Sequence, residues 1–355
     1  MIDMVFLTQV IDAKDPTLGF VTSWVGALAA RSASVTAVAN EVRGTPAFPA
    51  NVHVVSLGKE RGAGKMARGA ALQRAVATAP GDRPVVLAHM CPIYLDLAAP
   101  IAAVRRMPTM LWFAHPSVTP ALRVAERVAD VVLTSLPGAY PRPGPTVRVL
   151  GQATDTDRIW FDGSRVPRAG EIDLLAIGRT SPSKGFDHVI RALAKARADG
   201  IDATLRIVGP STTQEERAHA RDLAKLIAVH DLGSVVSLEP GLAPHEVDGV
   251  IRSADVLVSA MVSGSGDKVV FEAMAAGRLP LVSNAAFGSL LADLPLDLTF
   301  ERDDEGELAE RIVTLAATDV AVIEDARRSL RGRVEADHSL GGWADKVVAI
   351  AEDLR

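Results

Sequence analysis

Short, almost uninterrupted apolar runs alternate with helix-like stretches along the chain, and this alternation restricts the fold more than any other feature. Such runs are typical of strands that are buried on both faces, which occur in parallel sheets covered by helices. The first set predicts strands at residues 4–10, 34–40, 52–57, 84–90, 109–115, 130–135 and 146–151. Helix-like stretches such as 21–31 and 120–128 lie between several of them. The pattern therefore predicts an α/β fold with a doubly wound parallel sheet.

The pattern then restarts in the second half of the chain. Five further strands are expected at 173–178, 203–209, 235–241, 255–260 and 279–284, with helices at 186–198, 215–229, 244–253 and 268–276. The polar segment 152–170, which is marked by Gly and Pro, is interpreted as a linker. Because 355 residues are too many for one ordinary domain, we expect two Rossmann-like domains, residues 1–155 and 156–337, with a cleft between them. Ligands should bind at the carboxyl ends of the strands that face this cleft.

Composition excludes several classes of protein. Hydrophobic residues make up 48% and charged residues 23%, as in globular enzymes and unlike disordered or fibrous chains. The lone Cys91 rules out an internal disulfide framework and indicates a reducing compartment. The N-terminal stretch lacks a basic region, and no apolar run approaches the ~20 residues of a membrane span. We therefore expect a cytoplasmic protein without a transmembrane segment.

Two loops combine glycines with cations or with a helix start. In "LLAIGRTSPSKGFDHVIRAL" (174–193), a buried strand ends at Gly178, and Arg179 and Lys184 lie in the loop that opens the next helix. Cations beside a helix N-terminus favour a diphosphate ligand, and Gly178 lets the ligand approach the backbone. The alternative is that both cations are solvated. The second loop, "SGSGDKVVFEAMAAG" (263–277), also precedes a helix, yet that helix contains the carboxylate Glu272.

The ordered set "IGRTSPSKGFDHVI", "LRIVGP", "ADVLVSA" and "FEAMAAGRLPLVSN" resembles the donor half of glycosyltransferase family 4. The resemblance implies the GT-B fold and a retaining, sugar-nucleotide-dependent transferase that requires no metal or other cofactor. It implies that Arg179 and Lys184 hold the donor diphosphate and that Glu272 binds the ribose hydroxyls. It also implies that Glu239–Gly241 faces the base.

The chain departs from the family pattern at one position. The family has two glutamates eight residues apart, and Gly264 stands eight residues before Glu272. The missing glutamate would contact the donor sugar, so the identity of that sugar and, to a lesser degree, activity are open. The neighbouring loop residues are then expected to serve the donor instead: Ser265, Gly266, Asp267 and Lys268. For Asp267 the alternative is a helix N-cap, and the two roles are compatible.

In the first half, the resemblance assigns the acceptor to the turn "TQVIDAKDPTLGFVTSW" (8–24) and to two strand ends. Gly19 stands where the backbone comes close to phosphate or acceptor. Asp12 and Asp15 are candidate acceptor contacts, although turn formation is the favoured alternative for both. His89 and His115 each stand at the carboxyl end of a predicted buried strand. His115 matches the family position that faces acceptor and donor sugar and is favoured over His89, and for both the alternative is a structural histidine.

A basic excess marks the first half. The stretch 58–74 carries Lys59, Arg61, Lys65, Arg68 and Arg74 against Glu60 alone. It could contact an anionic or lipid-linked acceptor, or the inner face of a membrane as a peripheral protein. A solvated helix face is the favoured alternative, because the stretch contains no aromatic residue.

Other motif matches fail. Met66 follows Gly64-Lys65 where a phosphate loop needs Ser or Thr, and "GSGDKV" lacks the third glycine of a dinucleotide fingerprint. "DTD" (155–157) imitates a metal motif but falls in the expected linker, and the histidines show no zinc-ligand spacing. Neither a metal site nor a nucleic-acid partner is therefore expected.

The sequence thus predicts a retaining hexosyltransferase that uses a nucleoside-diphosphate sugar and an acceptor of unknown identity. A non-catalytic nucleotide-sugar-binding relative and another GT-B enzyme, such as a sugar-nucleotide 2-epimerase, remain alternatives. By analogy with GT-B enzymes, residues 338–355 should form a helix that crosses back to the first domain.

Overall fold

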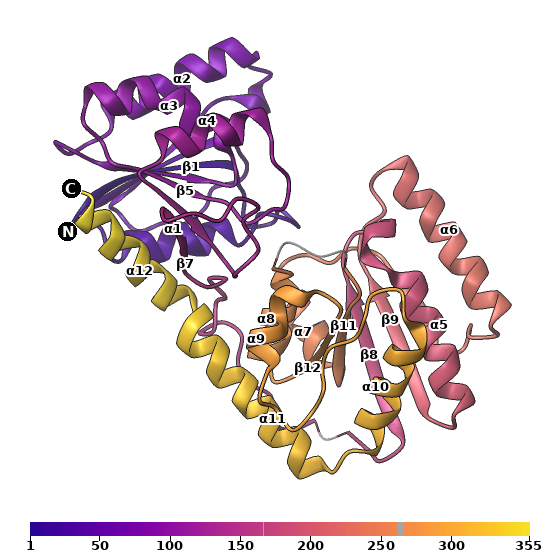
Figure 1. Ribbon diagram of the computed structural model, residues 1–355. Helices are drawn as coiled ribbons and strands as arrows, with labels where there is room; N and C mark the ends of the chain where they lie inside the picture. Colours follow the sequence, from indigo (N-terminus) through magenta and orange to yellow (C-terminus); the bar gives the residue numbers. More distant parts are fainter. Residues whose placement is uncertain (166, 262–265) are drawn as a thin grey trace. The chain divides into compact units, whose positions relative to one another are not determined.

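The computed structural model describes residues 1–165, 167–261 and 266–355. The chain divides into two compact units (Figure 1). Unit 1 comprises Met1–Asp155 together with Asp337–Arg355, and unit 2 comprises Thr156–Ala336. Within the described ranges, no helix is long and apolar enough to cross a membrane.

Unit 1 contains a seven-stranded sheet in the order β3-β2-β1-β4-β5-β6-β7, and every pairing in it is parallel. The strands are β1 Asp3–Ile11, β2 Ser34–Val42, β3 Val52–Ser56, β4 Val85–His89, β5 Thr109–Trp112, β6 Val131–Thr134 and β7 Val147–Val149. The helices are α1 Val21–Ala29, α2 Lys65–Thr78, α3 Pro92–Val104, α4 Pro120–Val128 and α12 Leu340–Asp353. Helices α2, α3 and α4 cover one face of the sheet, and α1 and α12 cover the other (Figure 1). The strand order reverses between β1 and β4, which is the switch point of the sheet.

Unit 2 repeats the plan with five parallel strands in the order β10-β9-β8-β11-β12. They are β8 Glu171–Ile177, β9 Asp202–Val208, β10 Val236–Glu239, β11 Val256–Ser259 and β12 Leu279–Val282. The helices are α5 Phe186–Ala198, α6 Gln214–Val229, α7 Val247–Arg252, α8 Lys268–Ala275, α9 Gly288–Leu291, α10 Glu305–Ala317 and α11 Val320–Arg333. The switch point lies between β8 and β11. The predicted α/β class with two doubly wound parallel sheets is therefore confirmed.

Side-chain caps begin several of these helices at the positions that the sequence favours. Thr119 caps α4 and is followed by Pro at the first helical position, and Asp304 and Asp319 cap α10 and α11. Helix α6 begins with a complete capping box, in which Thr213 and Glu216 bond each other's backbone N–H groups.

The C-terminal helix α12 belongs to the core of unit 1. Trp343 is 1% exposed and lies 4.1 Å from the ring of Trp24 and 5.6 Å from that of Trp112, measured between ring centroids. The Trp24 indole N–H donates to the Ala153 carbonyl at 3.3 Å, and the backbone of Thr154 pairs with that of Ser339. The last helix and the segment around residue 153 are thus joined to α1.

The segment 152–170, predicted as a linker, is largely held against unit 2. Arg165 pairs with Asp173 and Asp255, and the buried Arg278 bonds both the carboxylate and the carbonyl of Asp162. The chain does pass from unit 1 to unit 2 within this segment, between Asp155 and Thr156, but its later polar residues are partners of arginines of unit 2. The segment therefore serves as a structural edge of unit 2.

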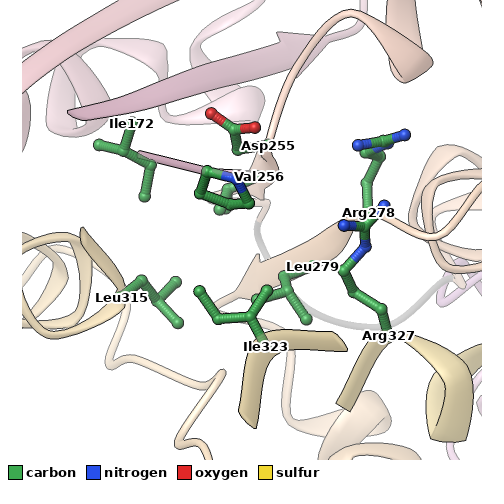
Figure 2. Close-up of a pocket in the computed structure, with 9 residues that line it drawn as sticks. Ile172, Asp255, Val256, Arg278, Leu279, Leu315, Ile323 and Arg327 are labelled. Atoms are coloured by element: carbon green, nitrogen blue, oxygen red, sulfur yellow. The ribbon is translucent and has the colours of Figure 1, made fainter. Parts of the chain in front are cut away.

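A small pocket marks this edge (Figure 2). Its lining includes the apolar side chains Ile172, Leu315 and Ile323, together with the guanidinium groups of Arg278 and Arg327. Burial lowers the pKa of Arg278 to about 10, and the nearby Arg327 adds to this effect. The pocket lies at the amino ends of β8, β11 and β12, whereas ligands of doubly wound sheets bind at the carboxyl ends.

Candidate functional site

The carboxyl ends of β8 and β11 bring the predicted diphosphate site to the switch point of unit 2. Gly178 follows β8 directly, with a φ of +155°, and its N–H donates to Val208 at 3.0 Å. A Cβ on Gly178 would lie 2.6 Å from Cε of Lys184, and a Cβ on Gly209 would lie 1.8 Å from the carbonyl oxygen of Gly178. Both glycines are therefore required for the close packing that places Lys184 over the end of β8.

Lys184 is the most enclosed predicted cation of the site. It ends a short 3-10 turn, Pro182–Lys184, and Gly185 then turns the chain into α5 with a φ of +63°. Its Nζ lies 3.0 Å from Sδ of Met261 and 3.5 Å from Oδ2 of Asp267, and the side chain is 19% exposed. The ammonium group is thus held at the strand ends by one carboxylate and a weak acceptor.

Asp267 occupies the N-cap position of α8, but its carboxylate accepts no hydrogen bond from that helix. Its Oδ2 instead accepts from the Ser259 hydroxyl at 2.9 Å and faces Lys184. The Asp267 side chain therefore does not cap the helix, and its carboxylate lies beside Lys184 at the strand ends. Gly266 directly precedes it, whereas Ser265 and Gly264 lie outside the described residues.

Arg179 lies on the more open side of the same loop. Its Nη1 is 3.0 Å from Oε1 of Glu216, and the Arg179 side chain is 63% exposed while that of Glu216 is 4% exposed. Glu216 also accepts from the hydroxyl and N–H of Thr212, both at 2.7 Å, and from the N–H of Thr213. These bonds, with that from the Thr212 hydroxyl as the main cause, lower the pKa of Glu216. The ionised Glu216 therefore orients Arg179 beside the N-terminus of α6.

Glu272 is 5% exposed and lies between two cations. Its Oε1 contacts Nζ of Lys268, one turn earlier on α8, and lies 3.9 Å from Nη2 of Arg158. Arg158 also forms an ion pair with Asp248 of α7, whose pKa is raised by burial, with the Glu272 charge contributing and Arg158 opposing. Glu272, which is predicted to bind the ribose, thus belongs to a cluster of four charged residues with Lys268, Arg158 and Asp248.

Glu239, predicted near the base, ends the edge strand β10. Arg206 clasps its carboxylate with two hydrogen bonds of 2.8 Å, and the Ser237 hydroxyl donates to it at 2.8 Å. These contacts, chiefly the hydrogen bond from Arg206, lower the pKa of Glu239 to about 2. The carboxylate therefore has a structural role at the sheet edge.

Glu239 carries a testable pH dependence of stability. Because its folded-state pKa is depressed from 4.5 to about 2, its contribution is complete above pH 4.5 and disappears as the pH falls through 2. We expect Glu239→Gln to be less stable than the wild type at pH 7 and the difference to vanish near pH 2. Denaturant unfolding at several pH values measures this, with Glu310→Gln as an exposed control. A difference that is constant with pH would contradict the assignment.

In unit 1, the predicted acids of the first turn are engaged in local hydrogen bonds. Oδ1 of Asp12 accepts from the N–H of Lys14 at 2.9 Å, and Oδ1 of Asp15 accepts from two N–H groups of its own turn at 2.8 and 2.9 Å. The buried Gly19 donates to the Asp15 carbonyl at 2.9 Å. These contacts favour the turn-forming alternative for both acids, and Gly19 lies in the same turn at the switch point.

The two histidines differ sharply in environment. His89 is 2% exposed, its Nδ1 lies 3.1 Å from the Thr8 hydroxyl, and aromatic rings of Phe6, Phe20 and Trp24 surround it. Burial lowers its pKa to about 3, so it is neutral at neutral pH. His115 is exposed, three residues after β5, and its Nδ1 accepts from the N–H of Ser117 at 3.1 Å. The structure favours packing for His89 and leaves His115 accessible.

Five residues of this region were not singled out from the sequence. They are Glu216, Ser259, Met261, Arg158 and Asp248. The capping-box spacing of Thr213 and Glu216 is visible in the sequence and could have identified the first. Arg158 and Asp248 are 90 positions apart, and no local pattern connects them.

The fold corresponds to a known class. Residues 171–318, which form most of unit 2, match the family model described as glycosyl transferases group 1. Two Rossmann-like domains with parallel sheets are the architecture of GT-B glycosyltransferases, so the predicted GT-B fold is confirmed.

Particular relatives share parts of the chain. A protein named as a colanic acid biosynthesis glycosyltransferase, WcaL of Escherichia coli K12, is 28% identical over 48% of this chain and 42% of its own length. The D-inositol 3-phosphate glycosyltransferase of Arthrobacter sp. FB24 is 33% identical over 34% of this chain and 28% of its own length. The chain thus spans less than half the length of these curated relatives.

Solved structures match the chain over nearly its whole length. Anabaena HepE in complex with UDP and glucose has a TM-score of 0.75 at 15% identity and covers 99% of this chain and 100% of its own. A sucrose-phosphate synthase of Thermosynechococcus elongatus has a TM-score of 0.74 at 17% identity, with 99% of each chain covered. At these identities the likeness concerns the fold.

Proposed function

We propose that the protein is a retaining glycosyltransferase that transfers a sugar from a nucleoside-diphosphate sugar to an acceptor hydroxyl. The main supporting observation is the partly buried Lys184 ammonium at the switch point of unit 2, where a doubly wound sheet binds its ligand. The match of residues 171–318 to a glycosyltransferase model and the UDP in the HepE structure agree with a sugar-nucleotide donor.

Negative charge develops on the diphosphate as the bond between its oxygen and the anomeric carbon breaks. Lys184, Arg179 and the N-terminus of α5 would stabilise that charge, which is the task that a metal ion performs in other transferases. The proposal therefore includes no metal and no other cofactor. The Lys184–Asp267 contact of 3.5 Å would be replaced in part by contacts to the phosphate oxygens.

Glu272 would accept hydrogen bonds from the ribose hydroxyls, with Arg158 and Lys268 holding its carboxylate in place. Asp267 would contact the donor sugar in place of the glutamate that Gly264 replaces. The acceptor would bind to unit 1 near Gly19 and His115. Its hydroxyl oxygen would bond to the anomeric carbon on the face that the diphosphate leaves, and its proton would pass to the departing phosphate.

Turnover with a panel of UDP-, GDP- and ADP-sugars tests the proposal. We expect one donor to bind and to be hydrolysed slowly even without acceptor, with release of the nucleoside diphosphate. Calorimetry on the same panel separates binding from chemistry. Binding without transfer or hydrolysis would favour the non-catalytic alternative, to which Gly264 points, and absence of binding would contradict both.

A further inference from the structure

Arg68 differs from the other cations at the carboxyl edge of the sheet in unit 1. Arg43 and Lys59 both pair with Glu41, and Arg61 pairs with Glu60. Arg68 donates from Nη1 to the neutral Oδ1 of Asn40 at 2.6 Å and has no carboxylate within ion-pair distance in the described part of the chain. Its Nε is buried and has no hydrogen-bond partner there.

The position of Arg68 is the one at which a ligand of this sheet would bind. Val38 of β2 and Leu7 of β1 face the core beneath α2 and α3, and strand side chains alternate, so Asn40 and Gln9 lie on the same face. Both stand near the carboxyl ends of their strands, beside the switch point between β1 and β4. Through its bond to Asn40, Arg68 therefore lies near the carboxyl ends of β1 and β2, on the sheet face that α2 and α3 cover.

Tyr94 of α3 adds a second unused donor. Its ring packs against the core layer beneath α2 and α3, and burial raises the pKa of its hydroxyl while the charge of Arg68 opposes that rise. No residue that the structure describes hydrogen bonds this hydroxyl. The exposed Lys65 lies three residues before Arg68 on α2, on the same side of the helix.

A partly desolvated guanidinium without a counter-charge is costly, and a buried N–H without an acceptor adds to the cost. Ordinary surface arginines avoid this cost by pairing, as Arg43 and Arg61 do. Asn40 accepts from Nη1 alone, and a guanidinium binds an oxyanion through charge-assisted hydrogen bonds from its accessible N–H groups. An oxyanion ligand would supply the counter-charge that Arg68 lacks among the described residues.

We propose that Arg68, with Tyr94 and Lys65, binds a phosphoryl group of the acceptor. The inference rests on the proposed function and names its acceptor class, a phosphate ester that is carried by either a soluble molecule or a lipid headgroup. Within the basic stretch 58–74, the proposal selects Arg68 and Lys65, which form no ion pair with any residue that the structure describes.

Calorimetric titration of the full chain with inorganic phosphate tests the site, in the presence of the saturating nucleoside diphosphate so that the cations of unit 2 are occupied. We expect the wild type to bind phosphate and Arg68→Ala to weaken binding at least tenfold. Arg74→Ala removes an exposed arginine of the same helix and should change binding less than twofold. Arg68→Gln, which keeps a donor for Asn40, serves if the alanine variant does not fold, and it should show the same loss.

Two further arms identify the carrier of the phosphoryl group. Binding of glycerol phosphate that depends on Arg68 indicates a soluble acceptor, and Arg68-dependent binding to phosphatidylglycerol vesicles but not to phosphatidylcholine vesicles indicates a lipid headgroup. Equal phosphate affinity in the Arg68 and Arg74 variants, or no phosphate binding by the wild type, would overturn the inference. The proposed function has a separate readout, because nucleoside diphosphate binding depends on unit 2 and should be unchanged in Arg68→Ala.

Discussion

Replacing Lys184 by alanine is expected to lower kcat/KM for the donor sugar nucleotide by about 10²–10³-fold, the usual effect of removing one preorganised group that stabilises a developing anion. The side chain is 19% exposed, so its charge acts in an environment that contains less water than the surface. The variant should also bind the nucleoside diphosphate more weakly. Steady-state kinetics of donor hydrolysis and calorimetry with the diphosphate measure the two effects.

Lys225→Ala is a matched control, because Lys225 is a 75% exposed lysine of α6 in the same unit. It should leave both measurements unchanged. Gly178→Ala offers an independent route to the same result, since the added methyl group would meet Lys184 Cε at 2.6 Å and displace the side chain. If Lys184→Ala and Gly178→Ala both bound the nucleoside diphosphate as tightly as the wild type does, the donor site would lie elsewhere.

The two predicted diphosphate cations are not equivalent in this structure. Arg179 is 63% exposed and already has a buried carboxylate partner, Glu216, whereas Lys184 is enclosed and faces the partly buried Asp267. An exposed ion pair is weakened by water and salt. Lys184 is therefore expected to contribute more to charge stabilisation, and Arg179 more to the first attraction of an anionic donor.

The strand pattern was sufficient to predict the architecture of both units. Runs such as 173–178 and 255–260 are mostly apolar because their strands are largely buried, and they correspond to β8 and β11 within two residues at each end. The local sequence alone is enough to predict a strand of this kind. The loop after β8 could likewise be predicted from its two glycines, because Gly178 and Gly185 have positive φ values, which glycine adopts readily.

The sequence does not predict which residues contact those of the candidate site. Glu272 was singled out, but its neighbours Arg158 and Asp248 come from segments far apart in the sequence, and only the folded sheet brings them together. The polar segment 152–170 resembled a linker for the same reason, since the arginines that bind it, Arg278 and Arg327, follow more than a hundred residues later. Long-range ion pairs leave no periodic signal.

The largest effect on stability is expected at the other end of the chain, for Trp343→Ala in α12. Trp343 is 1% exposed between Trp24 and Trp112, and truncation of such a residue leaves a cavity that costs about 3–5 kcal/mol. Within the described residues its indole N–H has no hydrogen-bond partner, so Trp343→Phe forfeits only ring volume and should cost clearly less. Denaturant unfolding followed by fluorescence measures both variants.

The tryptophans themselves make the measurement specific to one unit. Three of the four lie in this cluster of unit 1, and the fourth, Trp160, is 54% exposed in unit 2, so a Trp160→Phe background restricts the signal to unit 1. Hydrogen exchange of the β8 and β9 amides then reports unit 2 in the same samples. Because α12 belongs to the core of unit 1, Trp343→Ala should destabilise that unit and leave exchange in β8 and β9 unchanged. A loss below 1 kcal/mol, or an equal loss in both units, would contradict the view that the last helix completes the first core.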